Sequence, residues 1–139
     1  ETVKAQAHIA EKLGTEPDEP LVRIQMTARE NDAYFAYFDS YIPVNYVDEQ
    51  DLKIFEKGSL LDYLIEQDIL RIAYTNSFIY SISANADTAS WLRIPVGQPL
   101  LLMEEIFFSE AGNPVLWSRN HIITSILNLH IIRRVVHRL

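Results

Sequence analysis

The chain has 139 residues, 48% of them hydrophobic and 22% charged, a composition typical of one globular domain with its own core. Its net charge of −7 argues against a surface that binds nucleic acid unaided, because phosphate neutralisation requires a basic face. No apolar run approaches the ~20 residues that cross a bilayer, so no membrane partner is expected. The absence of cysteine excludes disulfides and thiolate chemistry, and it fits a cytoplasmic protein.

The first third of the chain predicts a helix followed by two strands. Apolar residues at spacings of three and four predict a helix over 3–13, with Gly14 as its C-cap. Strict alternation predicts a half-buried strand over 21–27. After a turn at residues 31–32, an aromatic-rich strand is expected over 33–42.

The middle of the chain predicts two short helices and a long strand. One helix is expected over 48–57, and a second follows Ser59, a good N-cap with Asp62 as its reciprocal partner. Alternation then predicts a strand over 72–84 with one aromatic face. The expected buried stripe of the second helix is Leu60, Leu61, Leu64 and Ile65.

The last third predicts another helix, a hairpin and a final strand. Asn85 or Asp87 is the expected N-cap, and the turn of the hairpin falls at 111–113. The β-branched segment after His121 predicts one more strand, beyond a loop near 124–125. We interpret its basic cluster as a charged strand edge rather than a DNA-binding patch. That cluster is Arg133, Arg134, His137 and Arg138.

The order helix, strand, strand occurs twice. With a shift of 79 positions, Pro20 falls on Pro99 and Leu21 on Leu100, and the apolar strand positions that follow coincide. We therefore predict two copies of one unit joined by a helical middle. The fold class is α+β, a central antiparallel β-sheet with helices packed on it and an internal pseudo-duplication.

Several motifs resemble a known family. Residues 92–101, LRIPVGQPLL, are similar to the motif L-G-hydrophobic-P-x-G-x-P-L-L, and residues 112–119, GNPVLWSR, to G-x-P-V-E-Y-S-R. Both motifs belong to the UTRA domain (UbiC transcription regulator-associated), the effector-binding part of HutC-type GntR bacterial repressors. The resemblance implies a chorismate-lyase-like fold over residues 1–139, a homodimer and a small-molecule effector. It also implies that DNA is bound only through an N-terminal winged-helix domain that is absent from this chain.

The resemblance also indicates the kind of effector. Members that bind a phosphosugar carry two paired arginines and two glutamates in the hairpins, and paired arginines suit phosphate. The matching positions here are all apolar, so we expect a pocket for a small, mostly apolar metabolite. An alignment slip of one or two residues would instead give Arg23 or Arg29 the arginine role. The matching positions are Met26 and Ala28 for the arginines, and Phe38 and Leu116 for the glutamates.

Further candidate ligand contacts come from the middle and the last hairpin. Ser59 matches the family serine at a helix start, where free N–H groups can receive an anion, although a plain N-cap is equally compatible. An aromatic stripe on the long strand could line a cleft, but such a stripe is more often core. The stripe candidates are Tyr74, Asn76 and Phe78, and those on the last strand are Asn120 and Ile122, on the face opposite to Arg119 and His121.

The sequence predicts no catalytic residue, no metal ligand and no cofactor. The four histidines lack metal-ligand spacing. Glu104 and Glu105 are adjacent on a strand, so their side chains point to opposite faces and cannot act as a carboxylate pair. The predicted function is effector sensing and dimerisation within a transcription regulator, not catalysis. A chorismate-lyase-like enzyme and a dimerisation module without ligand remain as alternatives.

Overall fold

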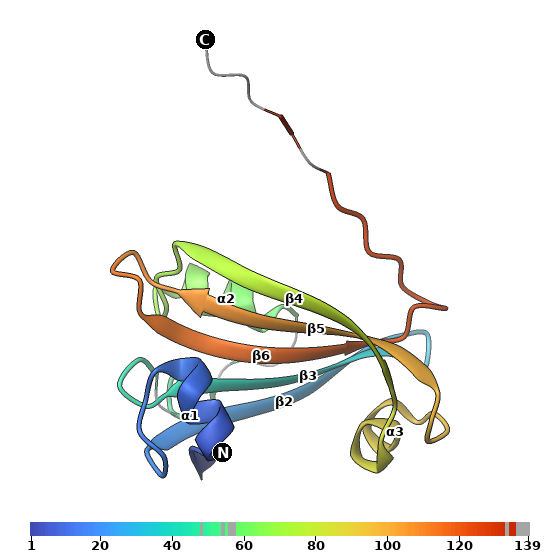
Figure 1. Cartoon of the computed structure of the whole chain (residues 1–139), viewed down its shortest axis with the longest axis horizontal. Coiled ribbons are helices and arrows are strands. Elements are labelled where there is room, and N and C mark those ends of the chain that lie inside the picture. Colours follow the sequence, from blue (N-terminus) through green and yellow to red (C-terminus); the bar gives the residue numbers. More distant parts are fainter. Residues whose placement is uncertain (48, 54, 56–57, 133, 136–139) are drawn as a thin grey trace.

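Six antiparallel strands form one sheet in the order β1-β2-β3-β6-β5-β4 (Figure 1). The computed structural model describes residues 1–47, 49–53, 55, 58–132 and 134–135. The strands are β1 (Thr2–Lys4), β2 (Pro20–Glu30), β3 (Ala33–Pro43), β4 (Tyr74–Ser83), β5 (Pro99–Phe108) and β6 (Pro114–Ile122). The helices are α1 (Ala7–Leu13), α2 (Leu60–Glu66) and α3 (Ala86–Leu92). The architecture confirms the predicted α+β class.

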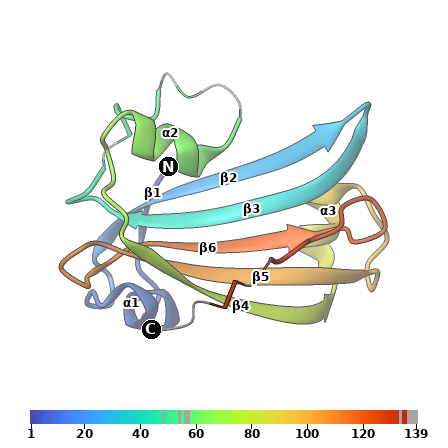
Figure 2. The ribbon, with the colours of Figure 1, turned by 90° about the horizontal axis from the view of Figure 1, so that it is seen from above.

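The helices cover the two faces of the sheet unequally. Figures 1 and 2 show α1 and α3 on one face, at opposite ends of the strands, and α2 on the other face. We call these the α1/α3 face and the α2 face. Leu64 of α2 packs with Val22 and Ile42 in the core of the α2 face. On the other face, α1 and α3 each form a separate core with the sheet, so the middle of that face lies between them.

The structure confirms the duplication and extends it. Helices α1 and α3 begin 79 residues apart, and so do strands β2 and β5. Equivalent loop bonds recur: the Ala5 N–H donates to Glu19 O and the Ala84 N–H donates to Gln98 O, both at 2.8 Å. Each helix is also preceded by an edge strand, β1 or β4. The repeated unit is therefore β-α-β-β.

The two units are interlocked through their helices. Strands β3 and β6 pair at the centre of the sheet. Helix α1 of the first unit packs against Trp117 of β6, and α3 of the second unit packs against Tyr37 of β3. Each unit therefore completes the core of the other.

Three predicted helix caps are confirmed. Ser59 Oγ accepts the Asp62 N–H at 3.2 Å and begins α2. Asn85, and not Asp87, caps α3, because its Oδ1 accepts the Thr88 N–H at 2.9 Å. Gly14 ends α1 in the left-handed conformation, with φ of 61°.

Four expectations were wrong in part. The first helix begins at Ala7 rather than residue 3, because Thr2–Lys4 pairs with β2. Residues 49–53 form turns instead of a helix; residues 48, 54, 56 and 57 lie outside the described residues. Ile65 does not belong to the buried stripe, since it is 48% exposed.

The fourth error is the final strand. Residues 124–132 and 134–135 form no strand. Both edges of β6 are already paired, with β3 and with β5, so a strand that follows β6 would have to join the sheet at β1 or β4. Residues 133 and 136–139 of the predicted strand lie outside the described residues.

Candidate functional site

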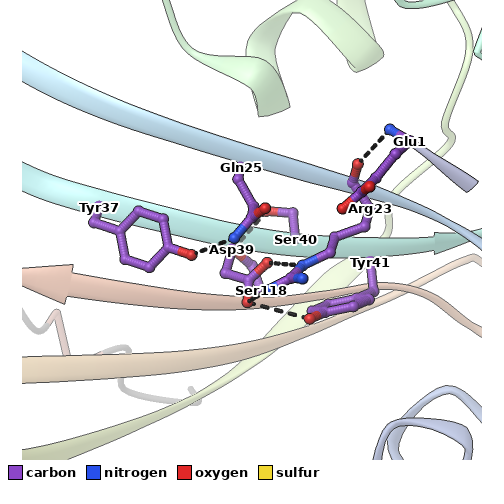
Figure 3. A network of polar contacts seen from close by, with 8 residues as sticks. All are labelled: Glu1, Arg23, Gln25, Tyr37, Asp39, Ser40, Tyr41 and Ser118. Carbon is purple, nitrogen blue, oxygen red and sulfur yellow. Dashed lines mark hydrogen bonds and ion pairs between the residues drawn. The ribbon is translucent and has the colours of Figure 1, made fainter. Parts of the chain in front are cut away.

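Hydrogen-bonded polar side chains cross the α2 face from the centre of the sheet to the β4 edge. The hydroxyl oxygens of Ser40 and Ser118 lie 2.9 Å apart (Figure 3), and Ser118 Oγ donates to Asn120 Oδ1 at 2.8 Å. Asn120 Nδ2 donates to Glu105 Oε2 at 2.8 Å, and Ser77 Oγ donates to Glu105 Oε1 at 2.9 Å. We call these five residues the α2-face network.

The network is buried at one end and accessible at the other. Ser40 is 4% exposed and Ser118 and Asn120 are each 6% exposed. Glu105 is partly buried and Ser77 is exposed. Buried polar groups require partners, and the network supplies them. A carboxylate can accept about four hydrogen bonds, so Glu105 retains acceptor capacity at the accessible end.

Apolar side chains surround the network. The strand register places Met26, Phe38 and Met103 on the same face, in the cross-strand row that contains Asn120 of the network. Ile79 follows in that row on β4 and is 48% exposed. Over the described stretches 22–28, 36–42, 75–81, 101–107 and 116–122, Glu105 is the only ionisable side chain on this face. The face therefore combines apolar surface with a few hydrogen-bonding groups and one negative charge.

Six residues predicted to contact a ligand lie together on this face. Met26 pairs with Phe38, and Phe38 pairs with Asn120, so these three form one row across three strands. The complete set is Met26, Ala28, Phe38, Leu116, Asn120 and Ile122. Sequence reasoning missed Ser40, Ser77, Glu105 and Ser118, because only the register between strands brings them together.

The structure does not bring the predicted aromatic stripe to this face. Asn76 pairs with Ile106 and Phe78 pairs with Glu104, which places both on the α1/α3 face. Tyr74 is on the same side of β4, and its ring stacks on Phe108 with centroids 4.8 Å apart. All three stripe residues are exposed.

A cavity of about 460 Å³ lies beside α2, between β2 and a segment that contributes Glu49, Leu52, Lys53 and Phe55. Ile24 and Met26 line it from β2, and Leu60 lines it from α2. Ser59 precedes Leu60, and its hydroxyl is engaged in capping the helix. Met26 therefore lines the cavity and also belongs to the cross-strand row that contains Asn120 of the α2-face network, which makes the two features continuous.

The opposite face carries an ion pair in its own hydrogen-bond arrangement (Figure 3). Arg23 Nε and Nη2 donate to the Asp39 carboxylate at 2.8 and 2.9 Å, and the Tyr41 hydroxyl donates to it at 3.2 Å. The hydrogen bond to Asp39 raises the pKa of Arg23, and burial raises the pKa of Tyr41 to about 12. Arg23 is thus committed to an internal carboxylate, although it also belongs to the lining of the cavity beside α2.

Three residues of β6 carry buried polar atoms without a hydrogen-bond partner. They are Trp117 Nε1, Arg119 Nε and His121 Nδ1, and all three side chains lie on the α1/α3 face. His121 also stacks on Tyr37, with ring centroids 5.3 Å apart. Burial, and then the charge of Arg119, lower the pKa of His121. The imidazole is therefore favoured in its neutral form.

Neighbouring acids are separated by the sheet. Glu104 forms an ion pair of 3.0 Å with Lys12 of α1, whereas Glu105 belongs to the α2-face network. The predicted separation of the two carboxylates is confirmed. Within the described residues, no group of three or more His, Asp or Glu side chains could hold a metal ion. In the same part of the chain, no helix has the length and apolar character needed to cross a membrane.

Comparisons with known proteins agree with this architecture. The model of the UTRA domain family matches residues 1–126. The C-terminal domain of Yurk from Bacillus subtilis is 20% identical with a TM-score of 0.79, covering 90% of this chain and 86% of that one. A GntR-family transcriptional regulator from Enterococcus faecalis V583 is 19% identical with a TM-score of 0.81, covering 96% and 95%. At such identities the likeness shows the fold.

A third relative was solved in two forms. PhnF from Mycobacterium smegmatis is 12% identical with a TM-score of 0.85, covering 96% of this chain and 59% of that one. Its effector domain alone has a TM-score of 0.82, covering 97% of this chain and 83% of that one. The match therefore corresponds to the effector domain of that protein. No curated protein matches the sequence.

Proposed function

Because the chain belongs to the UTRA domain family, a family of ligand-sensing regulatory domains, we propose that its effector binds on the α2 face. The single observation that carries this proposal is the α2-face network, a set of hydrogen-bonding groups within an apolar surface. Small-molecule sites commonly have this make-up. The adjoining cavity beside α2, which is lined by apolar residues and also by Glu1, Arg23, Glu49 and Lys53, would accommodate a further part of the effector.

The charge on the face restricts the chemistry of the effector. Glu105 offers a carboxylate, and no cation accompanies it over the described strand stretches of this face. At the network, a phosphate or carboxylate group would lose its hydration without gaining a positive partner, at a cost of several kcal/mol. We propose a small, mostly apolar metabolite with at least one hydrogen-bond donor, such as a hydroxyl, amide or amine.

The regulatory mechanism would be a shift between two arrangements of a larger protein. A ligand displaces such an equilibrium only by its difference in affinity for the two states. We propose that the chain acts as a homodimer in the cytoplasm and that DNA is bound by a winged-helix domain attached to it. PhnF, whose effector domain is a separable part of the chain, supports this arrangement. We do not propose an enzyme, because Glu104 and Glu105 are separated by the sheet and Arg23 is ion-paired.

A thermal-shift screen against a metabolite library tests the proposed site. Ligand at ~100 times its Kd should stabilise the fold by about 2.7 kcal/mol. The hits should be apolar molecules with a donor group. Glu105→Gln should weaken binding of amine-bearing hits by roughly tenfold, the effect of about 1.4 kcal/mol, and leave neutral hits less affected.

Phe78→Ala on the opposite face provides a matched control, since Phe78 is 46% exposed. It should leave every hit unchanged. Hits that respond to Phe78→Ala and not to Glu105→Gln would place the site on the α1/α3 face and contradict the proposal. A library without any hit would favour a dimerisation module that binds no ligand.

A further inference from the structure

Another cavity lies on the α1/α3 face, at the end of the sheet that α3 covers (Figure 1). Its volume is about 340 Å³, within the range of about 300–1,000 Å³ that is common for small-molecule sites. We call it the α3 cavity. It is lined by Thr27 of β2, Tyr34 of β3, Ser90 and Trp91 of α3, and Arg93, the residue that ends α3. The sheet separates this cavity from the α2-face network.

Arg93 has a backbone conformation that normally selects glycine. Its φ is 56° and its ψ is 47°, in the left-handed region. The equivalent residue of the first unit, 79 positions earlier, is Gly14, with φ of 61°. The UTRA motif L-G-hydrophobic-P also has glycine after its leucine, where this chain has Arg93. Because glycine ends a helix in this conformation at a lower cost than any residue with a Cβ atom, the arginine needs a reason other than helix termination.

The guanidinium of Arg93 is held at the cavity but is not neutralised. Its central carbon lies 4.9 Å from the ring centroid of Tyr34. Stacking of this kind occupies the face of the guanidinium and leaves the N–H donors at its edge available. Within the described residues the guanidinium has no hydrogen bond and no ion pair, whereas Arg23 and Arg71 are each paired with an aspartate.

The lining of the cavity favours an anion at that edge. Among the described residues that line it, Arg93 alone is charged. A guanidinium pairs well with a phosphate or a carboxylate, because its N–H donors match two oxygens of either group. The chain as a whole has a net charge of −7, so an unpaired arginine at a cavity is a local exception to its charge.

Trp91 provides an aromatic wall beside this arginine. It is 40% exposed, and its ring stacks on Tyr37 with centroids 5.0 Å apart and an interplanar angle of 11°. Tyr37 stacks in turn on His121 of β6, with centroids 5.3 Å apart. The three rings hold the indole in place from α3 to the centre of the sheet. A planar ligand ring can therefore stack on the exposed part of an indole whose position is already fixed.

From these observations we propose that the α3 cavity is a second ligand site, which binds a planar aromatic ring that carries one phosphate or carboxylate group. The ring stacks on Trp91, and the anion pairs with the edge of Arg93. The hydroxyls of Thr27 and Ser90, at the same cavity, offer hydrogen bonds to polar atoms of the ring. This site is independent of the proposed effector site, whose network contains a negative charge in place of a positive one.

Titration calorimetry of the full chain with matched probes tests the ligand class. Adenosine 5′-monophosphate combines a ring with a phosphate, and benzoate combines a ring with a carboxylate. Adenosine and benzamide keep the rings without the anion, and inorganic phosphate and acetate keep the anion without the ring. At least one complete probe should bind saturably, with a Kd at least tenfold below those of its two partial counterparts. The complete probe that binds identifies whether a phosphate or a carboxylate is preferred. Absence of saturable binding by both complete probes, or equal binding by a partial probe, would overturn the proposal.

Substitution of Arg93 separates a binding role from a structural one. Arg93→Gly should raise the Kd of the complete probe by roughly tenfold or more, while its melting temperature stays at or above that of the native chain, because glycine suits the backbone of this position. Arg93→Lys, which keeps the charge and loses the fork of donors, should give an intermediate Kd. Arg71→Gly is the matched control, since Arg71 is also exposed and lies outside the cavity. An unchanged Kd in Arg93→Gly would overturn the proposal.

Tryptophan fluorescence locates the bound probe. The chain has two tryptophans, and Trp117 is only 3% exposed. Stacking of the complete probe on Trp91 should quench the fluorescence of the native chain, and the quenching should disappear in Trp91→Phe. Quenching that persists in Trp91→Phe would place the probe elsewhere and contradict the proposal.

Discussion

At the scale of single residues, the two faces of the sheet differ in whether their carboxylates are paired with cations. On the α1/α3 face every carboxylate near the centre is matched by a cation: Asp39 by Arg23, and Glu104 by Lys12. On the α2 face Glu105 receives only neutral donors. On the first face the chain neutralises its own carboxylates by ion pairs. On the second face the charge of Glu105 is available to a ligand. This contrast is the physical reason for placing the effector on the α2 face.

The Arg23–Asp39 pair should stabilise the fold measurably. Its side chains are only 29% and 12% exposed, and removing one partner leaves a poorly solvated charge. Asp39→Ala should lower the free energy of unfolding by about 2–3 kcal/mol, measured by urea denaturation. Asp68→Ala is the matched control, because Arg71 and Asp68 form a similar pair at the surface, 81% and 70% exposed. Equal losses of unfolding free energy in the two variants would show that burial does not determine how much an ion pair stabilises this fold.

His121 should make stability depend on pH. Burial lowers its pKa in the folded state, so the unfolded chain binds the proton more readily and stability falls as the pH drops below the unfolded value of about 6.5. The melting temperature of the native chain should therefore decrease between pH 7.5 and pH 5. His121→Phe should flatten part of this decrease, whereas His8→Phe, at an exposed position, should not. An unchanged slope in His121→Phe would assign the pH dependence to other groups.

At the scale of elements, local pattern predicted most of the helices and strands, and non-local pairing decided the exceptions. The alternation over 21–27 and the cap at Ser59 are properties of neighbouring residues, and both predictions are confirmed. β1 was missed because Val3 also fits the helical spacing that continues through α1, and only its pairing with β2 makes it a strand. The prediction of a final strand was wrong for the converse reason. Its residues favour a strand, but no partner within the chain is adjacent.

The duplicated helices differ at their N-caps, and substitutions at the two cap positions test what each cap contributes to stability. Asn85 Oδ1 caps α3, while the equivalent Gln6 of α1 has an extended backbone but makes no side-chain cap. Asn85→Ala should destabilise the fold by about 1 kcal/mol. Gln6→Asn should stabilise it by about 0.5–1 kcal/mol, because it reproduces the cap of the other unit. Thermal unfolding measures both, and a destabilised Gln6→Asn variant would show that the two helix starts are not equivalent.

At the scale of the whole molecule, the site depends on pairing that sequence alone does not specify. Alternation indicated that Tyr74, Asn76 and Phe78 share a face, but not that α2 covers the other one. The network residues come from four strands, and Ser40 and Ser118 are 78 positions apart. Alignment with family motifs identified Met26 and Phe38, and alternation on the last hairpin strand added Asn120; the register does bring these three into one row. The motif positions were therefore predictable, and the polar groups that complete the candidate site were not.

The interlocked helices predict that neither unit folds alone. A cut between Gln67 and Asp68 separates α1 from Trp117 and α3 from Tyr37, so each fragment loses the strand that completes its helix core. Residues 1–67 and residues 68–139 should each lack cooperative thermal unfolding, and an equimolar mixture should regain it, as measured by circular dichroism. Trp117→Ala in the second fragment should weaken association by roughly a hundredfold or more, since such truncations cost about 3–5 kcal/mol. Val96→Ala should not weaken it, because that side chain is 70% exposed. Cooperative unfolding of either fragment by itself would mean that the two units, although interlocked in the complete sheet, can each bury a sufficient core.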